Sequence, residues 1–395
     1  MTKREFLKNA GILGMTTPFL STLLASCREN ELFFPDFSPD FTGKVLIIGA
    51  GAAGITAGHI LHKHGIDFQI LEAAATHGGR VKKAADFADF PIDLGGEWIH
   101  TDPSILAKLN NDDQAATQIE IITYNPQTIS TWHNDKLRRR NFASNFYSEY
   151  KFKNSTWFDF FDELMVAGFP EQITYNSPVT TIDYTSNQVT VTNTAGDTFL
   201  SDKVLVTVPI SILQSDDITF LPSLPAEKQA AIDEERMPNG IKVFIEFSKR
   251  FYPDIILAGG LLSALNSSDF AYYDAAFGKD SDRHIFALFA VGEKAEPYAS
   301  LPTDEAIIAK VLGELDEMFS GQATQHYVKH IVQNWSREPF IRGSYSQGWS
   351  DPETLARPVN DRIFFAGEAM ALTGNTSTVH GAAESAYEAV QQMLT

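Results

Sequence analysis

Residues 44–80 read KVLIIGAGAAGITAGHILHKHGIDFQILEAAATHGGR, and this stretch decides the fold. The apolar, β-branched run at 44–48 is typical of a buried parallel strand. The residues that follow predict a helix over 52–64, closed by a glycine, and a second strand over 67–71 that ends at Glu72. A strand, a helix and a second strand in this order indicate a βαβ unit with a parallel sheet.

Three glycines between the first strand and the helix have the spacing G-x-G-x-x-G. Gly49 permits the tight turn, Gly51 lets the backbone approach a pyrophosphate, and Gly54 lets the helix pack close to the strand. The free N–H groups of the helix N-terminus favour phosphates. Glu72, 18 residues after Gly54, stands where a carboxylate accepts from an adenosine ribose hydroxyl. The pattern predicts a dinucleotide site rather than an ordinary glycine turn, and it suits NAD and FAD alike.

A second pair of glycines, followed by Arg80, comes soon after the second strand at 78–79. Two glycines and an arginine at this place could clamp the same pyrophosphate from its other side. Such a clamp suits a cofactor that is held permanently.

Composition and charge limit the classes of function. The 395 residues are 44% hydrophobic, enough for two closely joined domains. A formal net charge of -19 disfavours nucleic acid as a partner and attracts cations, including protonated amines. The single cysteine, Cys27, excludes a disulfide-based fold and a cysteine metal cluster. We expect no metal site, and nothing in the sequence indicates an oligomeric state.

The first 27 residues have the features of an export signal. A basic start with Lys3 precedes an apolar stretch at 10–25, which is too short to span a bilayer comfortably. The segment Leu24-Ala25-Ser26-Cys27 resembles a lipobox, and residues 2–8 resemble a twin-arginine signal with Lys3 in place of the first arginine. We expect an exported cell-envelope lipoprotein, anchored in a membrane through Cys27, by either the twin-arginine or the Sec route. The alternatives are an uncleaved anchor or a buried cysteine.

Periodicity predicts the remaining elements. Residues 28–43 suit a tether whose phenylalanines (Phe33, Phe34, Phe37 and Phe41) could dock onto the body. Residues 103–175 are expected to be mostly helical, and an antiparallel meander over 173–209 should lead into a buried strand at 203–208. Further helices are expected at 226–235, 304–319 and 379–394, and further strands at 241–247, within 256–291, at 326–335 and at 363–366.

Some candidate residues could serve packing or lie in solvent rather than contact a cofactor, a substrate or a metal. In DLGGEWIH, residues 93–100, the paired glycines suggest a backbone pressed against a flat or phosphorylated group, while Trp98 and His100 suit either packing or substrate contact. Lys242, in an alternating strand, is on these grounds alone a solvated lysine. Three histidines on the 52–64 helix are expected to face solvent rather than bind metal (His59, His62 and His64).

Five segments in fixed order resemble the flavin-containing amine oxidases, which include monoamine oxidases, polyamine oxidases, histone lysine demethylases and L-amino-acid oxidases. They are the glycine fingerprint with Glu72 and Gly-Gly-Arg, DLGGEWIH, NGIKVFIEF, W-x-x-x-P-x-x-x-GSYS and FAGEA…STVHGAAESA, which together anchor residues 44–395. The resemblance implies a mixed α/β and α+β architecture: a discontinuous, glutathione-reductase-like FAD-binding domain with a smaller substrate domain of sheet and helices. We expect residues 1–27 to be the signal and 28–43 the tether. The FAD-binding domain is expected to consist of 44–102, 176–235 and 346–395. The substrate domain is expected to consist of a helical part, 103–175, and a part with its sheet and helix, 236–345.

The resemblance also implies which residues hold FAD. Glu72 would bind the adenosine ribose, Arg80 and Glu368 the pyrophosphate and ribitol, and the backbone of Val179 the adenine. The start of the last helix would point at the flavin, where free N–H groups stabilise negative charge. The complete expected set is Gly49, Gly51, Ala52, Ala53, Gly54, Glu72, Ala73, Gly79, Arg80, Gly95, Gly96, Glu97, Trp98, Val179, Gly367, Glu368, Thr378 and Val379.

The candidate catalytic residues implied by the resemblance are Lys242, Trp335 and Tyr345. Lys242 matches the family lysine that holds a water against flavin N5, and Tyr345 matches one wall of an aromatic cage for amines. Thr378 stands at the second wall, so a two-tyrosine cage is not expected, and substrate contacts are expected from His100, Trp98 and Thr378. Ser344 replaces the cysteine that binds flavin covalently in monoamine oxidases, which implies non-covalent FAD.

The predicted function is oxidation of a primary or secondary amine to an imine, with O2 or another acceptor taking the electrons and O2 giving H2O2. The acidic chain and the Trp-Ile-His segment favour a polyamine-like cation. No arginine stands in DLGGEWIH to bind a substrate carboxylate, as an L-amino-acid oxidase would suggest. The alternatives are another FAD-dependent oxidoreductase of the superfamily, such as a desaturase, a dehydrogenase or an L-amino-acid oxidase, and a non-catalytic flavin-binding envelope protein.

Overall fold

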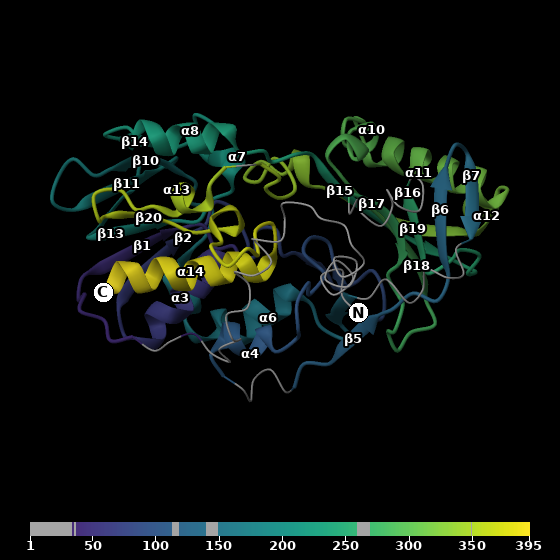
Figure 1. The fold of residues 1–395 in the computed structure, drawn as a ribbon, viewed down its shortest axis with the longest axis horizontal. Helices are drawn as coiled ribbons and strands as arrows, with labels where there is room; N and C mark the ends of the chain where they lie inside the picture. Colours follow the sequence, from purple (N-terminus) through teal and green to yellow (C-terminus); the bar gives the residue numbers. More distant parts are fainter. Residues whose placement is uncertain (1–33, 35–36, 113–117, 140–148, 259–268, 349) are drawn as a thin grey trace, which may run out of the picture.

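The computed structural model describes residues 34, 37–112, 118–139, 149–258, 269–348 and 350–395. A parallel sheet with its helices lies at one end of the molecule and a larger sheet at the other (Figure 1). None of the described helices is long and apolar enough to cross a membrane. Cys27 and the rest of the predicted export signal lie outside the described residues.

The parallel sheet is built on the glycine-fingerprint strand. Its order is β20-β13-β1-β2-β9, and every neighbouring pair is parallel. Along β1, Val45 and Ile47 pack against helices on one face, while Leu46 and Ile48 pack against a four-stranded sheet on the other. Burial on both faces explains the continuous apolar run. The strands are β1 Lys44–Ile48, β2 Asp67–Leu71, β9 Ile173–Thr174, β13 Lys203–Val206 and β20 Ile363–Phe365.

Two helices cover one face of this sheet, and a four-stranded sheet covers the other. The helices are α3 (Ala52–Lys63) and α14 (Val379–Leu394), which pack on each other. The four-stranded sheet has the order β12-β11-β10-β14 and contains the predicted meander. Its strands are β10 Val179–Asp183, β11 Val189–Asn193, β12 Thr198–Ser201 and β14 Thr219–Leu221.

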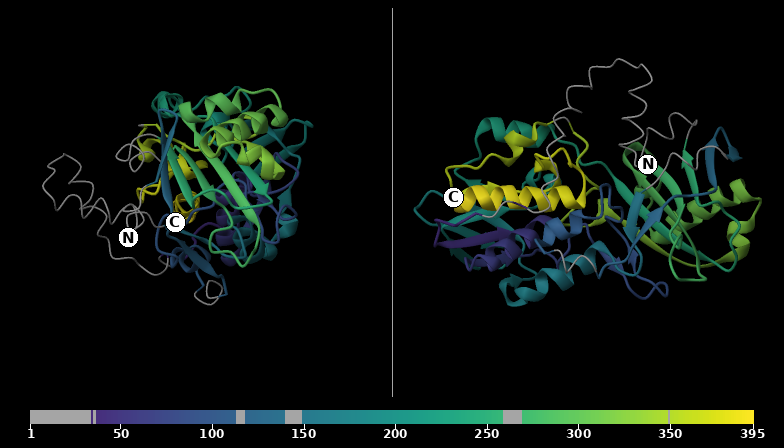
Figure 2. Two further views of the ribbon diagram at one scale, coloured as in Figure 1. Left: turned by 90° about the vertical axis from the view of Figure 1, so that its right-hand side faces the viewer. Right: turned by 60° about the horizontal axis from the view of Figure 1, so that its bottom comes forward.

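The larger sheet has seven strands in the order β19-β15-β18-β17-β16-β6-β7. One face packs against α11 (Asp304–Phe319); in the left view of Figure 2 these green elements face the viewer. Within β15, Ile241 and Val243 point into that core, so Lys242 points to the opposite face, as the alternation predicts. The strands are β6 Ile129–His133, β7 Lys136–Arg139, β15 Gly240–Phe247, β16 Ile255–Ala258, β17 Phe270–Asp274, β18 His284–Val291 and β19 Tyr327–Asn334.

Short elements connect these layers. They are β3 Lys83–Ala84, β4 Ile92–Asp93, α7 Ile210–Leu213, α8 Ala226–Glu234, η4 Gly292–Lys294, α10 Glu296–Ala299, α12 Gln322–His326, η5 Trp335–Arg337, α13 Pro352–Ala356 and η6 Glu368–Met370. The helices predicted at 52–64, 226–235, 304–319 and 379–394 are thus confirmed to within one residue at each end.

The prediction that 103–175 is mostly helical is wrong. Only α4 (Ile105–Asn110) and α6 (Trp157–Leu164) are α-helices among its described residues; the rest includes two short 3-10 turns and five strands. Strand β6 joins the large sheet by pairing in parallel with β16, and β9 joins the parallel sheet. Strand β6 also forms a local hairpin with β7 through a turn at Asn134 and Asp135, a short-range signal that the aromatic residues of this region outweigh in the prediction. The remaining elements are β5 Ile121–Tyr124, β8 Glu149–Phe152, η2 Val166–Gly168 and η3 Pro170–Gln172.

The described part of the predicted tether lies against the body. The Phe34 ring stacks on Tyr387 of α14 with 3.7 Å between ring centroids, and Phe37 lies 4.5 Å from the His64 ring. The Asp40 N–H donates to the carbonyl oxygen of Leu394. These contacts hold residues 37–43 beside the ends of α3 and α14.

His59 of α3 is buried rather than facing solvent, because α4 and α14 cover this helix. Its Nε2 lies 3.4 Å from the carbonyl oxygen of Asn110. Burial, followed by the charge of Lys63, lowers the pKa of His59 from 6.5 to about 4. The sequence shows three histidines at helical spacing but not the helices that pack over them.

This burial gives a pH-dependent stability. Between pH 6.5 and about 4 the folded state binds fewer protons at His59 than the unfolded state, so the free energy of unfolding falls as pH is lowered. We expect His59→Gln, which keeps a nitrogen donor for Asn110, to remove up to about 3 kcal/mol of this pH dependence. Urea unfolding of both proteins from pH 7 to pH 4 measures it. If the free energies of unfolding of the two proteins differ by the same amount at pH 7 and at pH 4, the expectation is contradicted.

Candidate active site

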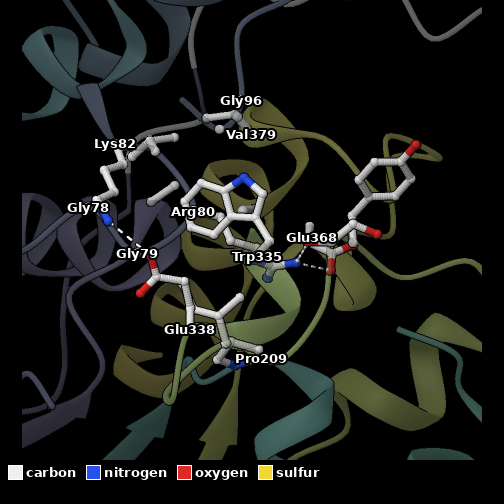
Figure 3. A pocket seen from close by; sticks show the side chains of 18 of the residues that line it. Gly78, Gly79, Arg80, Lys82, Gly96, Pro209, Trp335, Glu338, Glu368 and Val379 are labelled. Atoms are coloured by element: carbon white, nitrogen blue, oxygen red, sulfur yellow. Dashed lines mark hydrogen bonds and ion pairs between the residues drawn. The ribbon is translucent and has the colours of Figure 1, made fainter. Parts of the chain in front are cut away.

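A cavity of about 1110 Å³ lies between the parallel sheet and the large sheet. It exceeds the roughly 300–1,000 Å³ of ordinary ligand pockets, so it has room for a dinucleotide and a small molecule together. One end is lined by the loops after β1 and β2, and the other by strands β15 to β18. The middle, drawn in Figure 3, is lined by the Gly-Gly-Arg, DLGGEWIH and GSYS segments and the start of α14.

The glycine fingerprint forms the nucleotide end. Gly49 has φ +105°, a conformation that side chains rarely adopt. A Cβ on Gly54 would lie 1.9 Å from the carbonyl oxygen of Gly49, whereas a Cβ on Gly51 would meet nothing within 4 Å. Gly51 therefore faces open cavity, while Gly54 packs behind the loop and does not line the cavity. Gly54 therefore has the packing role that the sequence predicts, and it does not belong in the expected set of residues that contact the cofactor.

Glu72 is fixed at the end of β2 by backbone amides. Its Oε2 accepts from the N–H of Ala50 at 2.6 Å, and its Oε1 accepts from the N–H of Ala74 at 2.8 Å. Each carboxylate oxygen keeps a further lone pair for a ligand hydroxyl. Val179 lines the same end of the cavity.

Arg80 and Glu368 form an ion pair in the middle of the cavity wall, with 2.8 Å between Nη1 and Oε1 (Figure 3). The same Nη1 donates to the carbonyl oxygen of Ser344 at 3.0 Å. Glu368 also accepts from the N–H groups of Ser346 and Ser377, both at 3.1 Å. One arginine and one carboxylate thus join three parts of the sequence, at Arg80, at 344–346 and at 368–377. A quarter of the Arg80 side chain (25%) stays exposed for a ligand.

The last helix begins at the cavity, as predicted. Thr378 is its N-cap, and its Oγ1 accepts from the N–H of Gly381 at 3.0 Å. Val379 lies beside Gly96 (Figure 3), where a Cβ on Gly96 would come within 2.4 Å of the valine side chain. The glycine therefore lets the DLGGEWIH backbone approach the helix start. Free N–H groups at a helix N-terminus favour an anionic or polar ligand atom.

Lys242 is buried at the far end of the cavity, with 3% exposure, and is not the solvated lysine that its strand pattern alone favours. Its Nζ donates to Glu97 Oε2 at 2.8 Å and to the carbonyl oxygen of Asp93 at 3.2 Å. An ammonium group has three N–H donors. Since these two contacts use two of them, one N–H remains for a water or a ligand in the cavity.

Glu97 is the centre of a buried charge cluster that the sequence did not reveal. Besides Lys242, it accepts from Tyr273 Oη at 2.6 Å and from Lys151 Nζ at 3.3 Å. Burial raises the pKa of Glu97, but the positive charges of Lys242 and Lys151 outweigh it, and the pKa is lowered to about 2. Neither Lys151 nor Tyr273 lies in a recognisable motif, so no sequence signal could have identified them.

The aromatic candidates lie at this end too. Trp335 is 6% exposed, and its Nε1 donates to the carbonyl oxygen of Leu94 at 3.1 Å. Burial raises the pKa of Tyr345 to about 12, so its hydroxyl is neutral at physiological pH. Trp98 packs edge-on against Tyr124, with 5.0 Å between ring centroids, and also lines the cavity.

His100 and Glu149 add a polar pair to the cavity wall. Their side chains are 3.3 Å apart, and Glu149 is 9% exposed. Apart from Gly54, every residue predicted to bind cofactor or substrate or to act in catalysis lines the cavity. Among the described residues, no group of histidine, cysteine and acidic side chains could hold a metal ion.

These residues fit FAD. The open backbone at Gly51 leaves space for a pyrophosphate, and the cavity continues to a helix start and a buried lysine at the opposite end. The only cysteine of the chain, Cys27, lies outside the described residues, so no described cysteine could attach the cofactor covalently. This agrees with the non-covalent FAD that the family resemblance implies.

Comparisons with known proteins agree with this geometry. Residues 167–394 match the family model described as flavin containing amine oxidoreductase, and residues 47–110 match an NAD(P)-binding Rossmann-like domain. The chain is 25% identical to rice polyamine oxidase 3 over 89% of each protein. It is 33% identical to mouse lysine-specific histone demethylase 1B, over 50% of this chain but only 25% of that protein.

The solved structures support the fold. A structure described as wild-type putrescine oxidase bound to putrescine superposes with a TM-score of 0.71 and 16% identity, covering 89% of this chain and 98% of the other. At that identity the likeness concerns the fold alone. Because the first family match covers more than half of the 395 residues, the chain belongs to the flavin containing amine oxidoreductases and is an FAD-dependent amine oxidase.

Proposed function

We propose that this enzyme oxidises a primary or secondary amine of a polyamine-like cation to the imine and releases H2O2. Bound FAD would accept the equivalent of a hydride from the carbon beside the amine nitrogen and pass two electrons to O2. The observation that carries the proposal is the buried Lys242 ammonium, which lines the cavity with one N–H left for a water or ligand.

The walls around Lys242 suit an aliphatic amine chain. Ile255, Leu257 and Phe289 line this end and exclude water. A positive charge on the reacting nitrogen is disfavoured there, because apolar walls and the nearby ammonium both oppose it. The residues therefore favour the neutral amine at the reacting position, which is the form that carries the nitrogen lone pair.

A second, protonated nitrogen of the substrate would find a carboxylate. Glu149 is buried, lines the cavity and has His100 as its neighbour. Arg80 is the one arginine among the described residues that line the cavity, and it is already bound to Glu368. A substrate carboxylate thus lacks a free guanidinium, which disfavours amino acids. The likeness to rice polyamine oxidase 3 supports the same substrate class.

The role of Glu149 can be tested with matched substrates. We expect Glu149→Gln to raise KM for putrescine about tenfold or more, since a hydrogen bond to a charged group contributes about 1.5–3 kcal/mol. The KM for butylamine, which has the same carbon chain without the second nitrogen, should change less than about threefold. Steady-state kinetics with both amines measures the difference, and an equal change for both would remove Glu149 from recognition.

The reaction itself is tested by stoichiometry. The FAD-loaded enzyme is mixed with putrescine, spermidine, a lysine peptide and an L-amino acid, and O2 uptake and H2O2 release are recorded together. The proposal expects one H2O2 for each O2 consumed, fastest with the diamine or polyamine. Turnover with an artificial electron acceptor but not with O2 would identify a dehydrogenase instead.

The location of the enzyme is a proposal from the sequence. We propose export to the cell envelope and anchoring through a lipid on Cys27, supported by the basic, apolar and lipobox-like segments of residues 1–27. Fractionation of cells with wild-type protein or Cys27→Ala tests it. The wild type should be found with membranes and the variant should be released; equal distribution of the two would refute the anchor.

A further inference from the structure

Behind the cavity wall lies a second buried lysine, Lys151 of β8, with 1% exposure. Its Nζ donates to Glu97 Oε1 at 3.3 Å and to the carbonyl oxygen of Ala275 at 3.1 Å. The other oxygen of Glu97 accepts from Lys242 and Tyr273. One carboxylate therefore bridges two ammonium groups, of which only Lys242 lines the cavity.

Three aromatic rings surround the Lys151 ammonium. The ring centroids of Trp98, Tyr124 and Tyr273 lie 5.4, 5.3 and 6.0 Å from its Nζ. Ring faces attract a cation at such distances. A buried lysine is otherwise costly, and a methionine of similar length would fill the space without a charge. The site is thus arranged to keep a positive charge beside Glu97.

The positive charge of Lys151 changes how far the Glu97 carboxylate neutralises Lys242. Without Lys151, the carboxylate of Glu97 would neutralise Lys242 alone; with it, one carboxylate is shared between two cations. Two more groups border the cluster. Burial, then the charge of Glu97, raises the pKa of Asp93. Burial, then the charge of Lys151, lowers the pKa of Lys279 to about 8. The raised pKa of Asp93 favours its neutral form, so this carboxyl group offsets little of the positive charge.

We propose that Lys151 is a positioning residue for the amine oxidation: it holds the far oxygen of Glu97 so that the near oxygen aims Lys242 into the cavity, and it keeps the cavity wall positive. The inference rests on the proposed role of Lys242. Its consequence is that Lys151 acts through Glu97 and Lys242, although it touches neither substrate nor cofactor.

A double-mutant cycle tests this coupling. The variants are Lys151→Met, Lys242→Met and the double variant, with Lys151→Arg as the conservative rescue. Lys228→Met is the matched control, because Lys228 is also a buried lysine, donates to the carbonyl oxygens of Thr354 and Leu355, and does not line the cavity. The measurements are FAD dissociation constant, melting temperature, flavin midpoint potential, and the rates of anaerobic flavin reduction and of reoxidation by O2.

The proposal expects Lys151→Met to keep FAD affinity within about threefold, to lower the midpoint potential, and to slow by about tenfold the step that Lys242→Met slows. Lys151→Arg should restore the rate to within about threefold. In the Lys242→Met background, Lys151→Met should change the rate less than about twofold, because the residue it acts through is gone. Lys228→Met should lower the melting temperature and leave potential and rates unchanged.

Two results would overturn the inference. One is a Lys151→Met protein with a lower melting temperature but wild-type potential and rates, as a purely structural lysine would give. The other is an undiminished effect of Lys151→Met in the Lys242→Met background. If Lys242→Met itself behaves like wild type, the proposed function of Lys242 fails; if only Lys151→Met does, this inference fails alone. Should Lys151→Met not fold, Lys151→Gln keeps a donor for Ala275, lacks the charge and carries the same expectations.

Discussion

Lys242→Met is expected to bind FAD normally and to slow flavin reduction by amine, or flavin reoxidation by O2, by about 100-fold or more. The expectation follows from the position of the ammonium, which is buried, held by Glu97 and the carbonyl oxygen of Asp93, and lines the cavity with one N–H left for a water or ligand. Removing one preorganised donor from a water-excluded site costs about 10²–10³ in rate. Methionine fills the same space, so packing should change little.

Stopped-flow spectroscopy of the two half-reactions measures the effect and assigns it to one step. Lys228→Met again serves as the control for replacing a buried lysine, since it lies away from the cavity. Rates within about twofold of wild type for both half-reactions would exclude Lys242 from the mechanism. Loss of bound FAD from the variant would contradict the expectation that Lys242 acts on chemistry rather than on cofactor binding.

Gly51→Ala is expected to leave the apoprotein as stable as wild type and to weaken FAD binding by about tenfold or more. A Cβ at this position meets nothing within 4 Å, so the folded chain accepts it without strain. The methyl group would, however, stand where the backbone must approach the pyrophosphate. The predicted effect is therefore confined to the cofactor.

Gly54→Ala provides the contrast. Its Cβ would lie 1.9 Å from the carbonyl oxygen of Gly49, so the helix must move away from the loop and the apoprotein itself should lose stability. Gly313→Ala in α11, where a Cβ also meets nothing within 4 Å, is the neutral control. Titration of apoprotein with FAD and melting curves of the apoprotein separate the two effects. Wild-type FAD affinity in Gly51→Ala would mean that no phosphate approaches this turn.

Local signals were enough to predict the nucleotide end of the site. The strand at Lys44–Ile48, the glycine turn and α3 follow one another in the sequence, and the Thr378 cap lies next to the helix that it begins. The roles of these residues towards FAD come from the resemblance to a family, and the fold agrees with the positions. Each of these signals lies within a few residues of the structure that it specifies.

Long-range packing was not predictable in the same way. Strand β6 forms a local hairpin with β7, but its place in the large sheet comes from parallel pairing with β16, more than a hundred residues away. His59 is buried by helices from distant parts of the chain. Lys151 lies in no motif of the sequence, and only the fold shows that it shares Glu97 with Lys242. In each case the deciding contact joins segments that no local pattern links.

The central claim, that this cavity holds FAD and presents an amine to it beside Lys242, is tested most directly by anaerobic titration. The purified FAD-loaded enzyme is mixed with putrescine or spermidine in the absence of O2, and the oxidised-flavin absorbance is followed. The account predicts full loss of that absorbance with one equivalent of amine and its return when O2 is admitted. Retention of the oxidised spectrum with every amine tested, while FAD remains bound, would contradict it.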